Sequence, residues 1–168
     1  TGLFADVASQ QPAPGVIPFE INHPQWQDGA IGSHFLALPG QEAVTVYKDP
    51  QPVDVLAMFY SRLHYPAGTV LVKTLSMPAD PSQDRLSDVK LETQLLHFDG
   101  RLWRGYSYCW NDQQTDAQLV DSAGAEILVP GSHPQRWRIH SRTECMQCHN
   151  LWPETTLAFT PEQLHQPH

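Results

Sequence analysis

Residues 91–110 read Leu-Glu-Thr-Gln-Leu-Leu-His-Phe-Asp-Gly-Arg-Leu-Trp-Arg-Gly-Tyr-Ser-Tyr-Cys-Trp. Two β-prone runs, Leu91–Phe98 and Arg101–Trp110, flank Asp99-Gly100, a dipeptide favoured in two-residue type I′ turns because both central residues take positive φ. The stretch therefore predicts a β-hairpin. In its second strand Tyr106, Tyr108 and Trp110 alternate and share one face, which suits a packed core or a flat cofactor.

The sequence before this hairpin also favours short strands. Thr69–Met77 alternates in polarity, Val44–Tyr47 is β-branched, and a short strand is expected at Phe35–Leu38. A single helix is predicted over Val53–Leu63, where apolar residues recur every four positions. The 15 prolines and 10 glycines indicate many turns. The predicted fold class is mainly β, with sandwich-like antiparallel sheets and short helices, the C-terminal ones carrying the motif described below.

The chain of 168 residues has the length of one domain. We expect residues 1–168 to form a single unit with three parts. The proline-punctuated residues 1–40 are predicted to form an extended arm, residues 41–130 a β-rich body, and residues 131–168 a helical segment.

The charge balance excludes two classes of partner. The formal net charge is −8, which is unfavourable for binding nucleic acid or anionic lipid. We also find no run of about 18 apolar residues, so the sequence predicts no membrane span.

Near the C-terminus, Cys145-Met146-Gln147-Cys148-His149 forms a C-x-x-C-H motif, the attachment signature of c-type haem. Two thiols at i and i+3 on one helical turn bond to the two vinyl groups of a porphyrin, and the next residue, His149, ligates the iron. With three cysteines and nine histidines in 168 residues, chance would give roughly 0.003 such motifs. The motif predicts one covalent haem c.

Local sequence places this motif on a helix. Ser141 and Glu144 form a predicted capping box, so a helix should begin at Ser141. Thr160, Pro161 and Gln163 repeat the pattern and predict a second short helix, with Gln163 reaching back to the cap.

Two other uses of the cysteines remain open. A zinc site would recruit Cys109 and His140 to join Cys145 and Cys148, although these two added ligands are scattered single residues. A thiol–disulfide site would need its first cysteine at the helix N-terminus, whereas Cys145 lies a full turn after Ser141. Otherwise Cys109 is interpreted as a small buried hydrophobe.

The sequence gives weaker indications of which other residues would contact the haem. Met77, at the end of a predicted strand, is a candidate distal ligand, and Arg142 and Trp137 are candidates for a haem propionate or pocket contact. Lys73, alone on an apolar strand, is a further candidate for iron or a propionate. The histidines other than His149 also remain candidates, as does Met58.

Several longer motifs carry a family resemblance. They are Thr1-Gly-Leu-Phe-Ala-Asp6, Phe19-Glu-Ile-Asn-His-Pro-Gln-Trp-Gln-Asp-Gly-Ala30, Gly68-Thr-Val-Leu-Val-Lys-Thr74, Leu91-Glu-Thr-Gln-Leu-Leu96, Gly105-Tyr-Ser-Tyr-Cys-Trp-Asn111, Thr115-Asp-Ala117, Trp137 and Ser141-Arg-Thr-Glu-Cys-Met-Gln-Cys-His149. Together they resemble a family of uncharacterised bacterial exported proteins with one C-x-x-C-H after a β-rich segment.

The resemblance implies an exported haem c domain, periplasmic or secreted, that is often joined to further cytochrome or dehydrogenase-like modules of the same polypeptide. Gln25, Gln94 and His140 depart from the family pattern, where Leu, Arg and Pro are usual. We therefore infer no distal-pocket residues of this chain from the family.

These features predict a c-type cytochrome domain that transfers single electrons through one covalent haem, rather than an enzyme on its own. Its acidic charge favours a redox partner protein with a basic docking face. A five-coordinate haem sensor or peroxidase-like enzyme is one alternative, and a zinc-stabilised β binding module is another.

Overall fold

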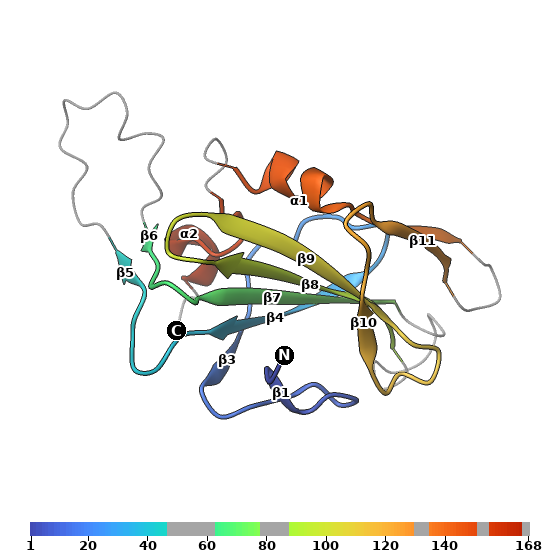
Figure 1. Ribbon diagram of the computed structural model, residues 1–168, viewed down its shortest axis with the longest axis horizontal. Coiled ribbons are helices and arrows are strands. Elements are labelled where there is room, and N and C mark those ends of the chain that lie inside the picture. The colour runs from blue at the N-terminus through green and yellow to red at the C-terminus, as the bar shows by residue number, and fades with distance from the viewer. Residues whose placement is uncertain (47–62, 78–87, 130–134, 151–154, 166–168) are drawn as a thin grey trace.

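The computed structural model describes residues 1–46, 63–77, 88–129, 135–150 and 155–165. At its centre is a six-stranded antiparallel sheet with the order β10-β9-β8-β7-β4-β3 (Figure 1). Its strands are β3 (Val16–Phe19), β4 (Ile31–Ala37), β7 (Val70–Met77), β8 (Val89–Phe98), β9 (Trp103–Trp110) and β10 (Ala117–Leu119).

Three two-stranded ribbons and two short helices complete the described structure. The ribbons pair β1 (Phe4–Asp6) with β2 (Gln11–Pro12), β5 (Thr45–Val46) with β6 (Leu63–His64), and β11 (Ala125–Leu128) with β12 (Arg136–Ile139). The helices are α1 (Arg142–Cys148) and α2 (Pro161–Leu164). The predicted class, mainly β with short helices, is confirmed. None of the described helices is long and apolar enough to cross a membrane.

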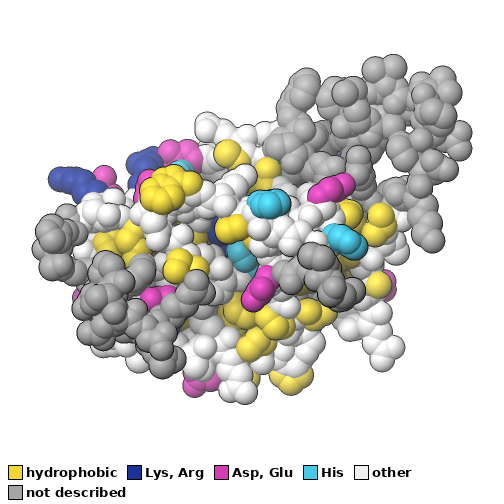
Figure 2. Space-filling model, turned by 180° about the vertical axis from the view of Figure 1, so that it is seen from behind, with side chains coloured by type: hydrophobic (Ala, Val, Ile, Leu, Met, Phe, Trp, Pro, Cys, Tyr) yellow, Lys and Arg dark blue, Asp and Glu magenta, His cyan; other side chains and the backbone are white. Residues whose placement is uncertain are grey.

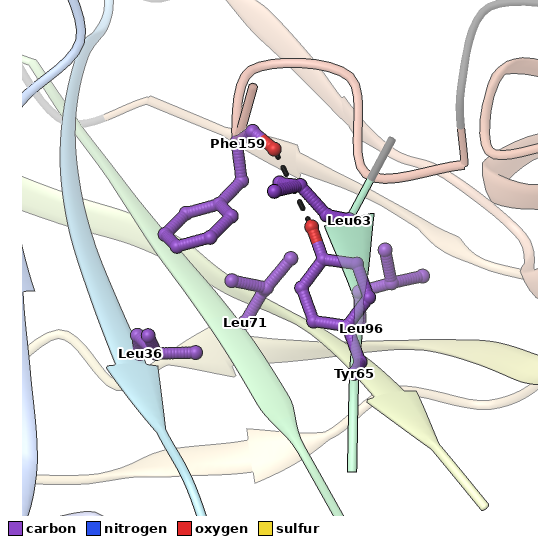
Figure 3. Close-up of a cluster of buried hydrophobic side chains, with 6 residues drawn as sticks. All are labelled: Leu36, Leu63, Tyr65, Leu71, Leu96 and Phe159. Carbon is purple, nitrogen blue, oxygen red and sulfur yellow. Dashed lines mark hydrogen bonds between the residues drawn. The ribbon is translucent and has the colours of Figure 1, made fainter. Parts of the chain in front are cut away.

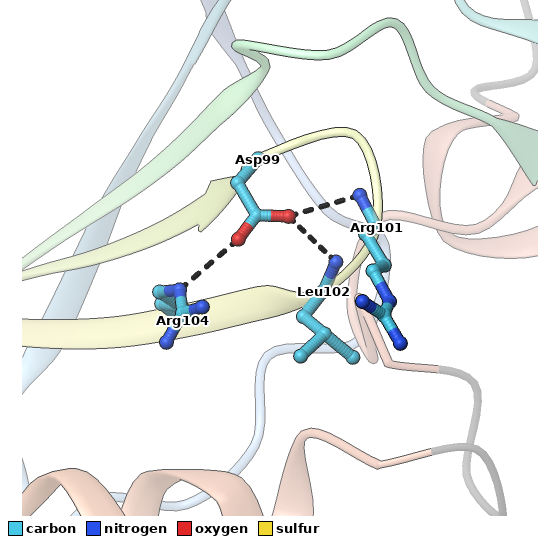
Figure 4. Close-up of polar contacts among 4 residues, drawn as sticks. All are labelled: Asp99, Arg101, Leu102 and Arg104. Carbon is cyan, nitrogen blue, oxygen red and sulfur yellow. Dashed lines mark hydrogen bonds and ion pairs between the residues drawn. The ribbon is translucent and has the colours of Figure 1, made fainter.

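The β8–β9 hairpin is present, but its turn differs from the prediction. Phe98 pairs with Trp103, so residues 99–102 form the loop in place of a two-residue turn. The Asp99 carboxylate accepts hydrogen bonds from the amides of Arg101 and Leu102 at 2.9 and 2.8 Å (Figure 4). This side chain satisfies the loop backbone locally, as aspartate does in Asx turns, which stabilises the longer connection.

The N-terminal residues are more than an arm. β3 and β4 lie within residues 1–40 and form one edge of the central sheet. The predicted strand at Phe35–Leu38 is observed as the longer Ile31–Ala37. Sequence missed this because the prolines suggested irregular chain, whereas Pro18 lies in the edge strand β3, where no second neighbour requires its missing amide. The helix predicted over residues 53–63 falls outside the described residues, apart from Leu63 in β6.

One face of the central sheet is covered by the C-terminal segment. At one end, Leu36, Leu71 and Leu96 from three neighbouring strands pack with Leu63, Tyr65 and Phe159 (Figure 3). At the other end, Leu75 of β7 and Leu91 of β8 pack under Trp137 and Ile139 of β12. Helix α1 packs against β9, and its Met146 contacts the first of these two clusters.

Candidate functional site

Helix α1 begins as the sequence predicts. The Ser141 hydroxyl accepts a hydrogen bond from the Glu144 amide at 3.1 Å, and the Glu144 carboxylate accepts one from the Ser141 amide at 2.8 Å. Arg138 donates to the other carboxylate oxygen at 2.7 Å. These contacts, led by the Ser141 amide, hold the pKa of Glu144 down at about 2. The charged carboxylate therefore anchors the start of the motif helix at neutral pH.

The second predicted cap is only partly as expected. The Thr160 hydroxyl accepts from the Gln163 amide at the start of α2. The Gln163 side chain does not reach back to the cap, and instead exchanges two hydrogen bonds with the backbone of His23. This pairing joins α2 to the N-terminal segment.

Glycine at position 105 allows α1 to approach the sheet closely. A Cβ atom built on Gly105 of β9 would lie 2.8 Å from Cys145 Cβ and 3.5 Å from Cys145 Sγ. Since carbon atoms normally pack 3.5–4.0 Å apart, no larger residue fits there without moving the helix. Gly105 thus sets the height of Cys145 above the sheet.

The turn before β11 also positions α1. The Arg142 amide donates to Ser122 O at 3.0 Å. Gly124 in the same turn has φ +83°, and a Cβ there would lie 2.5 Å from Ile139 O and 2.8 Å from Ser141 N. This close backbone approach fixes the chain just ahead of the helix.

Cys145, Cys148 and His149 all line one cavity of about 250 Å³. All described cysteines are free thiols, with Cys145 half-buried and Cys148 exposed. Burial, together with the negative charge of Glu92, raises the pKa of Cys145. Because a protonated thiol is a poor nucleophile, this environment does not favour thiol–disulfide chemistry.

The imidazole of His149 is oriented by the backbone. Its Nδ1 lies 2.7 Å from Thr155 O, which leaves Nε2 as the nitrogen available to a ligand. Burial lowers the pKa of His149, which favours the neutral ring that binds metals. Thr155 is itself held in place, because the next residue, Thr156, accepts a hydrogen bond from the Tyr65 hydroxyl at 3.0 Å.

A polar row crosses the sheet within the cavity wall. Strand register aligns Phe19 of β3, His34 of β4, Lys73 of β7 and Gln94 of β8 on the same face as Gly105 and Leu96. His34, Lys73 and Gln94 all line the cavity. Burial, with a contribution from the charge of Lys73, lowers the pKa of His34 to about 4. The row thus places a neutral imidazole and a lysine in the space that also contains the motif.

Glu92 lies beside this row and is almost fully buried, with 1% of its surface exposed. Its Oε1 accepts a hydrogen bond from Trp137 Nε1 at 3.1 Å, whereas Oε2 has no partner among the described residues. Burial raises the pKa of Glu92. The charge of Glu92 also opposes the lowering of the Lys73 pKa that burial causes, so these two groups are electrostatically coupled.

A larger hollow adjoins the cavity. It has a volume of about 1320 Å³ and shares Phe19, Ile21, His34, Lys73 and Phe159 with the smaller cavity. Trp26 also lines it and is 81% exposed. Figure 2 shows a face of the molecule on which several histidine side chains lie among hydrophobic ones. Together the two spaces offer a mostly apolar setting with a few polar groups, as small-molecule and cofactor sites do.

The other predicted site residues divide between the cavity and the rest of the molecule, and Lys73 is among those that line the cavity. Met77 and Trp137 belong to the cluster around Leu75 and Leu91, and neither lines the cavity of Cys145. Arg142 lies over the Tyr106 ring, 5.0 Å from its centroid, at the start of α1. Met58 falls outside the described residues.

Sequence reasoning did not single out His34 or Glu92. His34 was one of many candidate histidines. The structure distinguishes it by its pairing with Lys73, its place in the cavity and its buried Nε2. Glu92 carried a weak signal, since it is a charged residue within an otherwise apolar run. No sequence pattern indicated that Gly105 lies too close to Cys145 for a larger side chain.

No three His, Cys, Asp or Glu side chains within the described part of the chain are grouped to hold a metal ion directly. The zinc set of Cys109, His140, Cys145 and Cys148 is therefore not assembled. A c-type haem does not require such a group of metal ligands. Its two cysteines bond to porphyrin carbons, and its iron takes only one or two protein ligands.

Comparison with models of known protein families, with curated proteins and with solved structures finds no match to this chain.

Proposed function

We propose that this chain is a c-type cytochrome domain that carries single electrons on one covalently attached haem. The observation that supports this most is the convergence of Cys145, Cys148 and His149 on one cavity, with His149 Nδ1 held by Thr155 O. A hydrogen bond from a ligating imidazole to a backbone carbonyl fixes the tautomer and makes the other nitrogen a better ligand.

The residues around the motif fit the group. Cys145 and Cys148 would hold it by thioethers, His149 would ligate its iron, and the apolar side chains Leu71, Leu96 and Phe159 would limit its contact with water. The haem supplies the one-electron chemistry when bound, and the protein sets the potential through ligation, burial and hydrogen bonding.

Exposure of Cys148 favours electron exchange at the surface. A group bonded to its Sγ has its attached edge close to solvent, where a partner protein docks. The formal net charge of −8 suits a partner with a basic docking face. The resemblance described above supports a periplasmic or secreted location and further modules in the same polypeptide.

The proposal is tested by expressing the chain together with a c-type cytochrome maturation system. We expect a reduced pyridine haemochrome spectrum with one haem per chain that denaturation does not release. Cys145→Ser and Cys148→Ser should each leave at most one thioether and change the haemochrome spectrum, whereas Cys109→Ser should retain the wild-type spectrum. A folded, colourless wild-type protein, or haem loading that survives the loss of both motif cysteines, would refute the proposal.

A further inference from the structure

One histidine outside the motif lies in the same cavity as the motif. His34 projects from β4 on the face that α1 covers, and it lines the cavity with Cys145, Cys148 and His149. Its ring packs on Phe19 of the neighbouring strand, with centroids 5.4 Å apart. The ring therefore comes from the sheet, whereas His149 comes from the C-terminal segment that lies over the sheet.

The ring nitrogen Nε2 of His34 is buried and has no hydrogen-bond partner among the described residues. A buried polar atom without a partner is costly and calls for an explanation. Gly32, two residues earlier, leaves space beside this atom, since a Cβ there would lie 3.3 Å from His34 Nε2. A nitrogen in this state is suited to coordinate a metal.

Other side chains near His34 are alternative second ligands. Lys73 reaches the same space, and its Cε would lie 3.0 Å from a Cβ at Gly32. Burial lowers the pKa of Lys73, a shift that the charge of Glu92 opposes, so Lys73 is the rival ligand that Lys73→Gln tests. His34 is preferred because imidazole is the commoner metal ligand in proteins. His140 also lines the cavity, but it is exposed and immediately precedes the N-cap of α1, on the same flank as Cys145. Met77 lies in the opposite apolar cluster.

We propose that His34 is the distal axial ligand of the haem iron, giving a six-coordinate iron with two histidine ligands. This inference rests on the proposed function, since it requires a haem at Cys145 and Cys148. A second histidine ligand would distinguish an electron carrier from a gas sensor or peroxidase, which needs an open, five-coordinate iron.

The test compares the haem-loaded wild type with His34→Ala, His34→Met, Lys73→Gln and the control His97→Ala. His97 lies in β8 opposite Val70 and does not line the cavity. We expect absorption and electron paramagnetic resonance spectra of a low-spin, bis-histidine iron in the wild type, Lys73→Gln and His97→Ala. His34→Ala should become high-spin and bind carbon monoxide rapidly when reduced, and added imidazole should restore the low-spin spectrum. His34→Met should replace this spectrum with that of a His/Met iron.

Other outcomes overturn the assignment. A high-spin wild type that binds carbon monoxide would show that the distal position is open. A His34→Ala protein that stays low-spin, or a loss of the low-spin state on Lys73→Gln, would assign the ligand elsewhere. If His34→Ala does not fold, a His34→Met protein that keeps the wild-type spectrum also refutes the proposal. Absence of covalent haem from the wild type is a different result and contradicts the proposed function itself.

Discussion

An alanine at position 105 should lift the motif helix off the sheet. The added methyl group would lie 2.8 Å from Cys145 Cβ and 3.9 Å from Met146 Sδ. Against a normal carbon separation of at least about 3.5 Å, the helix must move by roughly 0.7 Å. Cys145 Cβ is attached directly to the helix backbone, so rotation of a side chain does not relieve the overlap.

The expected loss in the free energy of unfolding of Gly105→Ala follows from two opposing effects. Overpacking of a core position costs about 1–3 kcal/mol, while replacing glycine by alanine within a strand returns about 0.5–1 kcal/mol. The net loss is centred near 1 kcal/mol. For a chain of this length that corresponds to a fall in Tm of about 2–4 °C.

Thermal unfolding of the haem-loaded protein, followed by circular dichroism, measures this change. Gln118→Ala is the control, since Gln118 is an exposed residue of the neighbouring strand β10 and pairs with Cys109 of β9. We expect Gln118→Ala to melt within about 1 °C of the wild type, as a surface substitution away from the core should. A Gly105→Ala protein as stable as the wild type would show that Cys145 does not rest against β9.

Three further predictions concern the start of α1 and the partner. Ser141→Ala removes the cap and should cost about 1 kcal/mol in urea unfolding, with the exposed Thr143→Ala as the control. An equal cost in both would contradict the capping role. The pKa of Glu144 falls from 4.5 to about 2 on folding, so its stabilisation is complete above pH 4.5 and is lost as the pH falls toward 2. Glu144→Gln should flatten the pH dependence of the urea midpoint in that window, and an unchanged slope would be inconsistent with this. Electron exchange with a small basic redox protein should slow as salt rises, because the net charge is −8, and a salt-independent rate would argue against a basic partner.

Local patterns were sufficient for the elements that depend on neighbouring residues. The capping box of Ser141 and Glu144 is satisfied within four residues, and the β8–β9 hairpin follows from two adjacent runs. The turn type was wrong because the Asp99 carboxylate bonds to two amides of the loop, a contact that the Asp-Gly dipeptide does not specify.

The walls of the candidate site depend on contacts between distant residues. His34 and Lys73 meet only because β4 pairs with β7 in one register, and a shift by one residue would place either side chain on the opposite face. No periodicity within either strand encodes this pairing. The same limit explains why Glu92 and Gly105 were not identified.

Met77 lies at the end of a correctly predicted strand but outside the cavity that Cys145 lines. Lys73 and Met77 alternate onto the same face of β7. Four residues of strand span about 13 Å, however, which moves Met77 out of the cavity and under the β11–β12 ribbon, where the Gln135 side chain contacts its sulfur at 3.5 Å. Trp137 lies in the same cluster and donates to Glu92.

The most direct test of the proposed function is mass spectrometry of the denatured chain after expression with the maturation system. We predict an intact mass higher than that of the polypeptide by one haem, and a proteolytic peptide containing Cys145 and Cys148 that carries the whole increase. The polypeptide mass alone, with both motif thiols open to alkylation, would contradict the assignment of this domain as a c-type cytochrome.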